Sequence, residues 1–193
     1  MKPLILASNS PRRKELLMQA RLTFSVVAST IEEQVDRSLP PEQVVQRLAL
    51  EKANDVFSRH QDAVVIGADT VVVSDGEILG KPLHRMDAKE TLRLLSEQTH
   101  SVFTGVAIIS ANGYVAFAEE TKVTFWPLTD EEIDAYLDTG EPFDKAGSYG
   151  IQGLGALFVK EIAGDYFNVV GLPLSKTVRE LRNVGILSVM TKM

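Results

Sequence analysis

The chain has 193 residues and a formal net charge of -6, with 45% hydrophobic and 24% charged residues. This length fits one sizeable domain, or one domain with two lobes, and the composition is that of a globular protein rather than a disordered one. The negative charge argues against a general nucleic-acid-binding surface, and the absence of cysteine excludes disulfides, thiolate catalysis and cysteine-ligated metal sites.

The first half of the chain alternates strand and helix patterns. An apolar run at residues 4–7 predicts a buried strand, and Ser10-Pro11 is typical of a helix N-cap followed by proline. Residues 22–28 favour a strand, and residues 40–59 carry the apolar spacing of one helical face. The β-branched run at residues 63–73 predicts a central strand that is buried on both faces.

Hairpin signals dominate the second half. Ser74-Asp75-Gly76 and Asn112-Gly113 predict turns, because these residues tolerate the backbone conformations that tight hairpins require. The remaining predicted elements are strands at 77–79, 102–109, 114–125 and 156–162, helices at 87–95, 129–140 and 173–183, and a glycine-rich loop at 147–155. This order predicts one mixed α/β domain over residues 1–193, with a twisted central sheet flanked by helices.

The loop from Ala7 to Arg13 leads into a helix N-terminus, where free amide groups and the helix dipole favour an anion. Arg12 and Arg13 lie in the first turn, although cations are unfavourable at this end of the dipole. A phosphate bound there would explain their placement. The alternative is a capped helix with two solvated arginines, and the loop alone does not decide between them.

Two ionisable residues interrupt apolar patterns. Lys52 lies on the apolar stripe of its helix, so its ammonium must reach an anion or extend to the edge of the core. Asp69 interrupts the apolar run at residues 63–73, and a carboxylate buried there needs a cation, a metal or strong donors. A functional role for Asp69 is favoured over a purely structural one, because ionisable groups inside apolar elements are frequent in active sites.

Other polar residues are ambiguous when taken alone. Lys81 lies in a Gly-Lys-Pro sequence that lacks the spacing of a phosphate-binding P-loop, and it is otherwise a turn lysine. Glu32 and Glu33 could hold Mg²⁺ or be solvated loop charges. Gln152 could line a pocket together with backbone groups of its glycine-rich segment, or the segment could be a flexible connection. The histidines show no metal-ligand spacing, so none is assigned a role.

Considered together, several short segments between Leu4 and Leu181 resemble the Maf family of nucleoside triphosphate pyrophosphatases. Their order and spacing make the resemblance specific, although each segment is weak alone. The segments are Ala7-Ser8-x-Ser10-Pro11-Arg12-Arg13, Glu32-Glu33, Glu51-Lys52-Ala53, Gly67-Ala68-Asp69-Thr70, Gly80-Lys81-Pro82, Ala146-Gly147-x-Tyr149-Gly150-Ile151-Gln152-Gly153 and Val170-Gly171-Leu172-Pro173.

The resemblance implies two lobes around a substrate cleft, as in the inosine triphosphate pyrophosphatases, and dependence on a divalent cation, Mg²⁺ or Mn²⁺. It implies that Asp69 is the general base. It also implies a homodimer. The residues that it places along the cleft are Ser8, Arg13, Glu33, Lys52, Asp69 and Lys81.

Three further positions discriminate substrates in this family, namely Arg12, Thr70 and Gln152. A sister branch that acts on 7-methyl-GTP has Trp, Gln and Glu there. This chain resembles the branch that cleaves dTTP and UTP, and modified pyrimidine nucleotides are further candidate substrates.

The reaction so implied releases pyrophosphate and a nucleoside monophosphate. Asp69 would activate the water that attacks the α-phosphorus, and Glu33 would help Asp69 to hold the cation. Arg13, Lys52 and Lys81 would offset the charge of the phosphates. Burial would raise the pKa of Asp69, whereas a metal and the lysines would lower it, and the sequence leaves the balance open.

The resemblance implies that Ser8 and nearby amides hold the triphosphate at the helix N-terminus. It implies that Arg12, Thr70 and Gln152 contact the edge of the base.

Two alternative functions stay open. One is a non-enzymatic regulator of septum formation that binds proteins or nucleic acid, although the net charge argues against a general DNA-binding surface. The other is an enzyme that releases orthophosphate from the γ-position.

No apolar stretch is long enough to span a bilayer, and the apolar run at residues 4–7 is too short for a signal peptide. We therefore expect a soluble cytoplasmic protein with no membrane partner.

Overall fold

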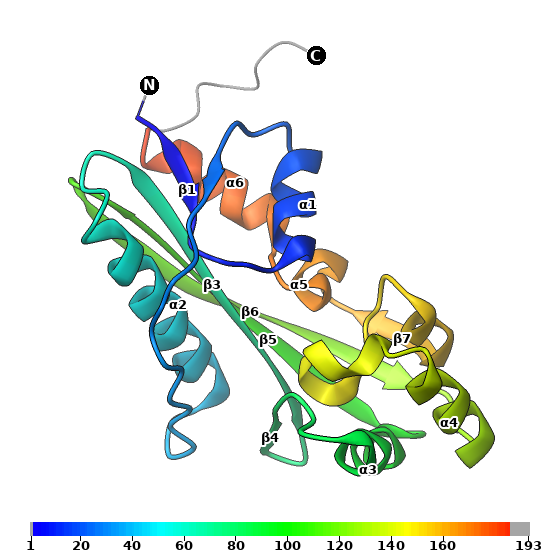
Figure 1. Cartoon of the computed structure of the whole chain (residues 1–193). Helices are drawn as coiled ribbons and strands as arrows, with labels where there is room; N and C mark the ends of the chain where they lie inside the picture. The colour runs from blue at the N-terminus through cyan, green and yellow to red at the C-terminus, as the bar shows by residue number, and fades with distance from the viewer. Residues whose placement is uncertain (1, 186–193) are drawn as a thin grey trace. The chain divides into compact units, whose positions relative to one another are not determined.

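The computed structural model describes residues 2–185, which form two compact units (Figure 1). The first unit contains the described residues up to Asp69, Thr104–Glu119 and those from Gly171 onward, and the second contains Thr70–Phe103 and Glu120–Val170. Residues 1 and 186–193 of the predicted domain lie outside the described residues. That the units fold as one domain stays a prediction.

The predicted mixed α/β architecture is confirmed. Over residues 2–185 the strands pair in the order β2-β1-β3-β5-β6-β7, with β4 paired to β3. β1 runs parallel to β2 and β3, whereas β4 is antiparallel to β3 and β7 is antiparallel to β6. The strands are β1 (Leu4–Leu6), β2 (Ser25–Val26), β3 (Val64–Ser74), β4 (Glu77–Leu79), β5 (Thr99–Ser110), β6 (Gly113–Phe125) and β7 (Val159–Ala163).

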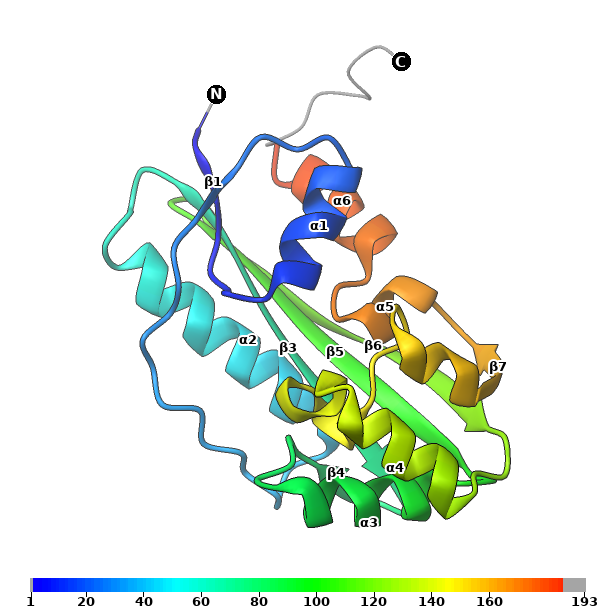
Figure 2. The ribbon, with the colours of Figure 1, turned by 45° about the vertical axis from the view of Figure 1, so that its right-hand side comes forward.

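The helices of each unit pack as local groups. In the first unit α1 and α6 lie side by side in both views, and in the second unit α3 and α4 do so (Figures 1 and 2). Within residues 2–185, no helix has both the length and the apolar character to cross a membrane. The helices are α1 (Pro11–Gln19), α2 (Pro41–Phe57), α3 (Arg85–Leu95), α4 (Asp130–Asp138), α5 (Tyr166–Val170) and α6 (Leu174–Asn183), with short 3-10 helices η1 (Glu141–Asp144), η2 (Ala146–Ser148) and η3 (Leu154–Phe158).

Two helix starts follow their sequence signals. The Ser10 hydroxyl accepts a hydrogen bond from the Arg13 amide at 3.4 Å, and Pro11 is the first helical residue of α1. At α4, Thr129 and Glu132 form the reciprocal capping box that the sequence predicts. The caps supply partners for amide groups that each helix leaves without an internal acceptor.

Two predicted strands are partly wrong. The strand expected at residues 22–28 is reduced to Ser25–Val26, an exposed edge strand with few pairing partners. The strand expected at residues 156–162 is preceded by the 3-10 turn η3, and only its later part lies in β7. Residues 156–158 belong to this turn, and the amides of Leu154 and Gly155 at its start bind the carboxylate of Glu141.

Gly67 brings α2 close to the central strand β3, as its position in an apolar run suggests. A Cβ added at Gly67 would lie 2.2 Å from the carbonyl oxygen of Ala49 and 2.8 Å from the amide nitrogen of Ala53. Both atoms belong to the helix backbone and cannot move alone. This close contact places the residues of α2 beside those that follow Gly67 in β3.

We expect Gly67→Ala to lower the free energy of unfolding by about 3 kcal/mol, because the extra methyl group forces α2 away from the strand. Urea unfolding measures this loss. Gly80→Ala is the control, since a Cβ there meets no atom within 4 Å. Equal stability of the two variants would contradict the close contact.

Candidate functional site

The side chain of Arg13, in the first turn of α1, is held by two residues outside the helix. Its Nε donates to the carbonyl oxygen of Gly171 at 2.8 Å, and its Nη1 donates to the Ser8 hydroxyl at 3.2 Å. The amide of Ser10 donates to the same hydroxyl at 3.2 Å. Hydrogen bonds to Ser8 and Gly171 therefore fix the side chain of Arg13, which is not simply solvated.

Lys52 joins two carboxylates in the first unit. Its Nζ lies 2.6 Å from Oδ1 of Asp69 and 2.7 Å from Oε1 of Glu33. The side chains of Lys52 and Asp69 are only 11% and 8% exposed, whereas that of Glu33 is 48% exposed. Lys52 thus reaches anions from the buried stripe of α2, and the buried Asp69 has the cation that its position requires.

The charges around Asp69 act on its pKa in opposite directions. Burial raises the pKa of the Asp69 carboxyl above its ordinary range, and Lys52 and Arg13 oppose this effect. Glu33 adds to the upward shift as a second negative charge. Among the protein's own groups, burial therefore outweighs the two cations Lys52 and Arg13. Burial also lowers the pKa of the Arg13 guanidinium, against the attraction of Asp69.

Glu33 and Asp69 have the chemistry of a Mg²⁺ site. Both direct a carboxylate oxygen at one cationic atom, the Nζ of Lys52. Mg²⁺ is commonly bound by one or two carboxylates that act together with water and substrate phosphates. Among residues 2–185, no group of three or more histidine, aspartate or glutamate side chains gathers for a metal ion. A cation held by this pair would take its remaining ligands from water and substrate phosphates.

The structure places the other predicted residues as follows. Arg12 is half-buried beside Arg13 in the first unit. Thr70 is half-buried and follows Asp69 in β3, but it belongs to the second unit. Lys81 and Gln152 are exposed residues of the second unit.

Within the second unit, one backbone contact links the segments of Lys81 and Gln152. The amide of Gly147 donates to the carbonyl oxygen of Gly80 at 3.2 Å. The Gly-Lys-Pro turn therefore lies beside the start of the glycine-rich segment. The first unit gathers Ser8, Arg13, Glu33, Lys52 and Asp69, and the second contains Thr70, Lys81 and Gln152.

Sequence reasoning missed two features of these groups. The carbonyl oxygen of Gly171 binds Arg13 although 158 residues separate them, and the motif containing Gly171 gave no hint of this contact. His100 was assigned no role, yet it is buried, and its Nε2 shares a hydrogen bond of 2.9 Å with the Tyr149 hydroxyl. Burial lowers the pKa of His100 to about 4, so its ring is neutral at physiological pH.

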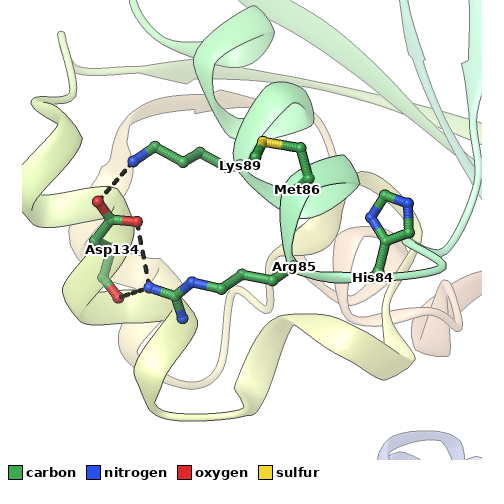
Figure 3. A pocket seen from close by; sticks show the side chains of 5 residues that line it. All are labelled: His84, Arg85, Met86, Lys89 and Asp134. Atoms are coloured by element: carbon green, nitrogen blue, oxygen red, sulfur yellow. Dashed lines mark hydrogen bonds and ion pairs between the residues drawn. The ribbon is translucent and has the colours of Figure 1, made fainter.

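A pocket of about 570 Å³ in the second unit holds a different set of side chains (Figure 3). Lys89 and Arg85 both contact the Asp134 carboxylate, at 2.6 and 3.2 Å. Arg85 also pairs with Asp138 at 2.7 Å. Because carboxylates balance both cations, this pocket lacks the net positive charge that a triphosphate requires. Its lining residues are His84, Arg85, Met86, Lys89 and Asp134.

Comparison with known proteins settles the family. The model of the family described as "Maf-like protein" matches residues 3–184. The chain belongs to the Maf family. This confirms the resemblance carried by the motifs around Arg13, Lys52, Asp69 and Gln152.

Several Maf relatives are similar over nearly their whole length. A dTTP/UTP pyrophosphatase of Halalkalibacterium halodurans is 59% identical over 96% of this chain and 97% of the relative. One from a Geobacillus species is 60% identical over 96% of this chain and 100% of the relative. One similar solved structure is that of the nucleoside-triphosphatase (dITP/XTP pyrophosphatase) of Mycobacterium abscessus, with a TM-score of 0.46. It is 13% identical to this chain, and the comparison covers 95% of this chain and 98% of the other.

Proposed function

We propose that this protein hydrolyses nucleoside triphosphates, dTTP and UTP among them, to the monophosphate and pyrophosphate. The observation that carries the proposal is the buried Asp69, which Lys52 links to Glu33. The relatives named dTTP/UTP pyrophosphatase support the choice of substrate. Such a reaction makes the enzyme a hydrolase that acts on acid anhydrides.

Asp69 is the proposed general base. Burial raises the pKa of its carboxyl in the protein alone, which makes Asp69 a better proton acceptor than an ordinary carboxylate at a pH above that pKa, and a bound cation would oppose this shift. It takes a proton from the water that attacks the α-phosphorus, and the bond from that phosphorus to the leaving pyrophosphate breaks. Lys52 holds Oδ1 of Asp69 in a fixed place during this step.

The cations of the site offset the charge that develops on the phosphates. Arg13 is positioned by Ser8 and Gly171, so its guanidinium loses little freedom when a phosphate binds. Lys52 is the second cation and Lys81 the third. Ser8 and the amide groups at the start of α1 hold the triphosphate chain.

Glu33 and Asp69 are the proposed ligands of a divalent cation, Mg²⁺ or Mn²⁺. When bound, such an ion neutralises phosphate charge and polarises the phosphorus–oxygen bonds.

We expect Glu33→Gln to raise the Mg²⁺ concentration for half-maximal activity by about tenfold or more, because one charged ligand is lost. A Mg²⁺ titration measures this, with Glu32→Gln as the neighbouring control. An unchanged requirement would remove Glu33 from the ligand set.

Arg12, Thr70 and Gln152 are proposed to contact the base. Their side chains offer donors and acceptors that suit the edge of a pyrimidine. Unmodified dTTP and UTP are the first candidates, and modified pyrimidine nucleotides are the second. A cytoplasmic location and a homodimer complete the proposal.

The product decides the reaction class. Incubation with dTTP and Mg²⁺ should release pyrophosphate and dTMP in equal amounts. Release of orthophosphate and dTDP would instead show attack at the γ-phosphorus and overturn the proposal. The names of the relatives give no support to the alternative of a non-enzymatic regulator of septum formation.

A further inference from the structure

The carboxylate of Glu141 binds the backbone of the segment that contains Gln152. The amide of Leu154 donates to its Oε2 at 2.9 Å, and the amide of Gly155 donates to its Oε1 at 3.3 Å. Hydrogen bonds to a charged acceptor are stronger than those between neutral groups. One side chain from η1 therefore fixes the chain immediately after Gln152 and Gly153.

Tyr136 of α4 extends this arrangement to the other side of Gln152. Its hydroxyl donates to Oε1 of Glu141 at 2.9 Å and accepts from the amide of Gly150 at 3.1 Å. Burial raises the pKa of Tyr136, so the hydroxyl stays protonated and can donate at neutral pH. Its ring packs edge-on against Phe158 at 4.9 Å. Gly150 and Gly155 are thus held through the same pair of side chains.

The glycine at position 153 provides the room for Glu141. A Cβ added there would lie 2.4 Å from Oε2 and 2.5 Å from Oε1 of that carboxylate. Any other residue at this position would push the carboxylate away from the amides of Leu154 and Gly155. The absence of a side chain at Gly153 therefore allows the Glu141 carboxylate to reach these two amides.

A second anchor lies within the same segment, just before Gly150. Tyr149 is buried, and its hydroxyl shares a hydrogen bond of 2.9 Å with Nε2 of the buried His100. Gln152 itself is exposed. The chain is therefore fixed at Tyr149, Gly150, Leu154 and Gly155, with the exposed Gln152 between these points.

We propose that Glu141, acting with Tyr136, is a positioning residue that holds Gln152 for discrimination between nucleotide bases. The inference rests on the proposed function, in which Gln152 contacts the base. A glutamine side chain carries both a hydrogen-bond donor and an acceptor. When its backbone is free to move, it can therefore bind a base that offers an acceptor or a base that offers a donor. Discrimination between UTP and CTP, which differ at position 4, therefore requires a fixed backbone.

Two conservative variants test the anchor. Glu141→Gln removes the charge and one carboxylate acceptor, and Tyr136→Phe removes the hydroxyl while keeping the ring. We expect each to reduce the ratio of kcat/KM for UTP over CTP by about tenfold, mainly through KM for UTP. Glu131→Gln on the exposed side of α4 is the matched control and should leave the ratio unchanged.

A double-mutant cycle separates positioning from general damage. Gln152→Ala should lower the UTP over CTP ratio by itself, and adding Glu141→Gln should then change that ratio no further. An equal additional loss in the Gln152→Ala background would overturn the proposal, because Glu141 would then act independently of Gln152. An unchanged ratio in Glu141→Gln and Tyr136→Phe would overturn it as well.

Hydrogen exchange provides a readout that does not depend on activity. The amides of Gly150, Leu154 and Gly155 should exchange faster in both variants, while the amides of β3 keep their wild-type rates. Should Glu141→Gln fail to fold, Tyr136→Phe carries the same test. If wild-type protein releases no pyrophosphate from UTP, the proposed function fails, and the inference fails with it. If Gln152→Ala lowers the ratio but neither Glu141→Gln nor Tyr136→Phe does, the inference fails and the proposed function stands.

Discussion

Replacing Asp69 with asparagine should lower kcat for pyrophosphate release from dTTP by about 10²–10⁴-fold, because the amide cannot accept a proton from the attacking water. The shape of the side chain is retained, and Arg13, Ser8 and Lys52 are still present for the phosphates. Binding of the nucleotide should therefore change much less than turnover. Single-turnover kinetics together with a binding titration would separate these two quantities.

Asp62→Asn is the matched control for this substitution. Asp62 is exposed, and it lies shortly before β3. We expect wild-type turnover from this variant. Wild-type turnover from Asp69→Asn would remove Asp69 as the base, whereas a loss confined to nucleotide affinity would reassign it to binding.

Replacing Lys52 with methionine should abolish turnover and also lower the free energy of unfolding by about 3–5 kcal/mol at neutral pH. The reason is that Asp69 would be left buried without its cation. Chemical denaturation measures the loss. Lys122→Met removes an exposed lysine of β6 and should leave stability within about 0.5 kcal/mol of wild type. A comparably small loss for Lys52→Met would show that the pair contributes little.

The same variant should show a pH dependence of defined sign. Burial already raises the folded-state pKa of Asp69, and removal of Lys52 takes away the strongest opposing charge. A carboxyl with a raised folded-state pKa favours folding at low pH and loses this contribution as the pH rises through that pKa. The destabilisation caused by Lys52→Met should therefore be smaller at pH 5 than at pH 8. The opposite order would contradict the direction of the shift.

The burial of Lys52 and Asp69 could be predicted from the sequence, because the spacing of apolar residues in a helix or strand indicates which side chains face the core. Lys52 falls on the apolar stripe of a helix, and Asp69 interrupts a buried strand, so each requires a partner. The sequence did not show that each is the partner of the other. Residue patterns alone gave no position for Glu33, which lies in an irregular segment without periodicity, and only the family resemblance placed it near Asp69.

The contacts that could not be predicted from the sequence involve irregular segments and join residues that lie far apart in the chain. Arg13 is held by a backbone carbonyl 158 residues away, and backbone carbonyls carry no side-chain signature. The role of Glu141 depends on a turn that brings its carboxylate to the amides of Leu154 and Gly155. The strand predicted over residues 156–162 starts three residues late, at Val159, because the apolar pattern does not distinguish a 3-10 turn from the start of a strand.

The two units are interleaved along the chain, since β3, β5 and β6 each contribute residues to both. The chain passes from one unit to the other at Asp69–Thr70, Phe103–Thr104, Glu119–Glu120 and Val170–Gly171. No single cut releases either unit as a continuous polypeptide. A recombination event at one point of the gene therefore cannot replace one unit and leave the other intact.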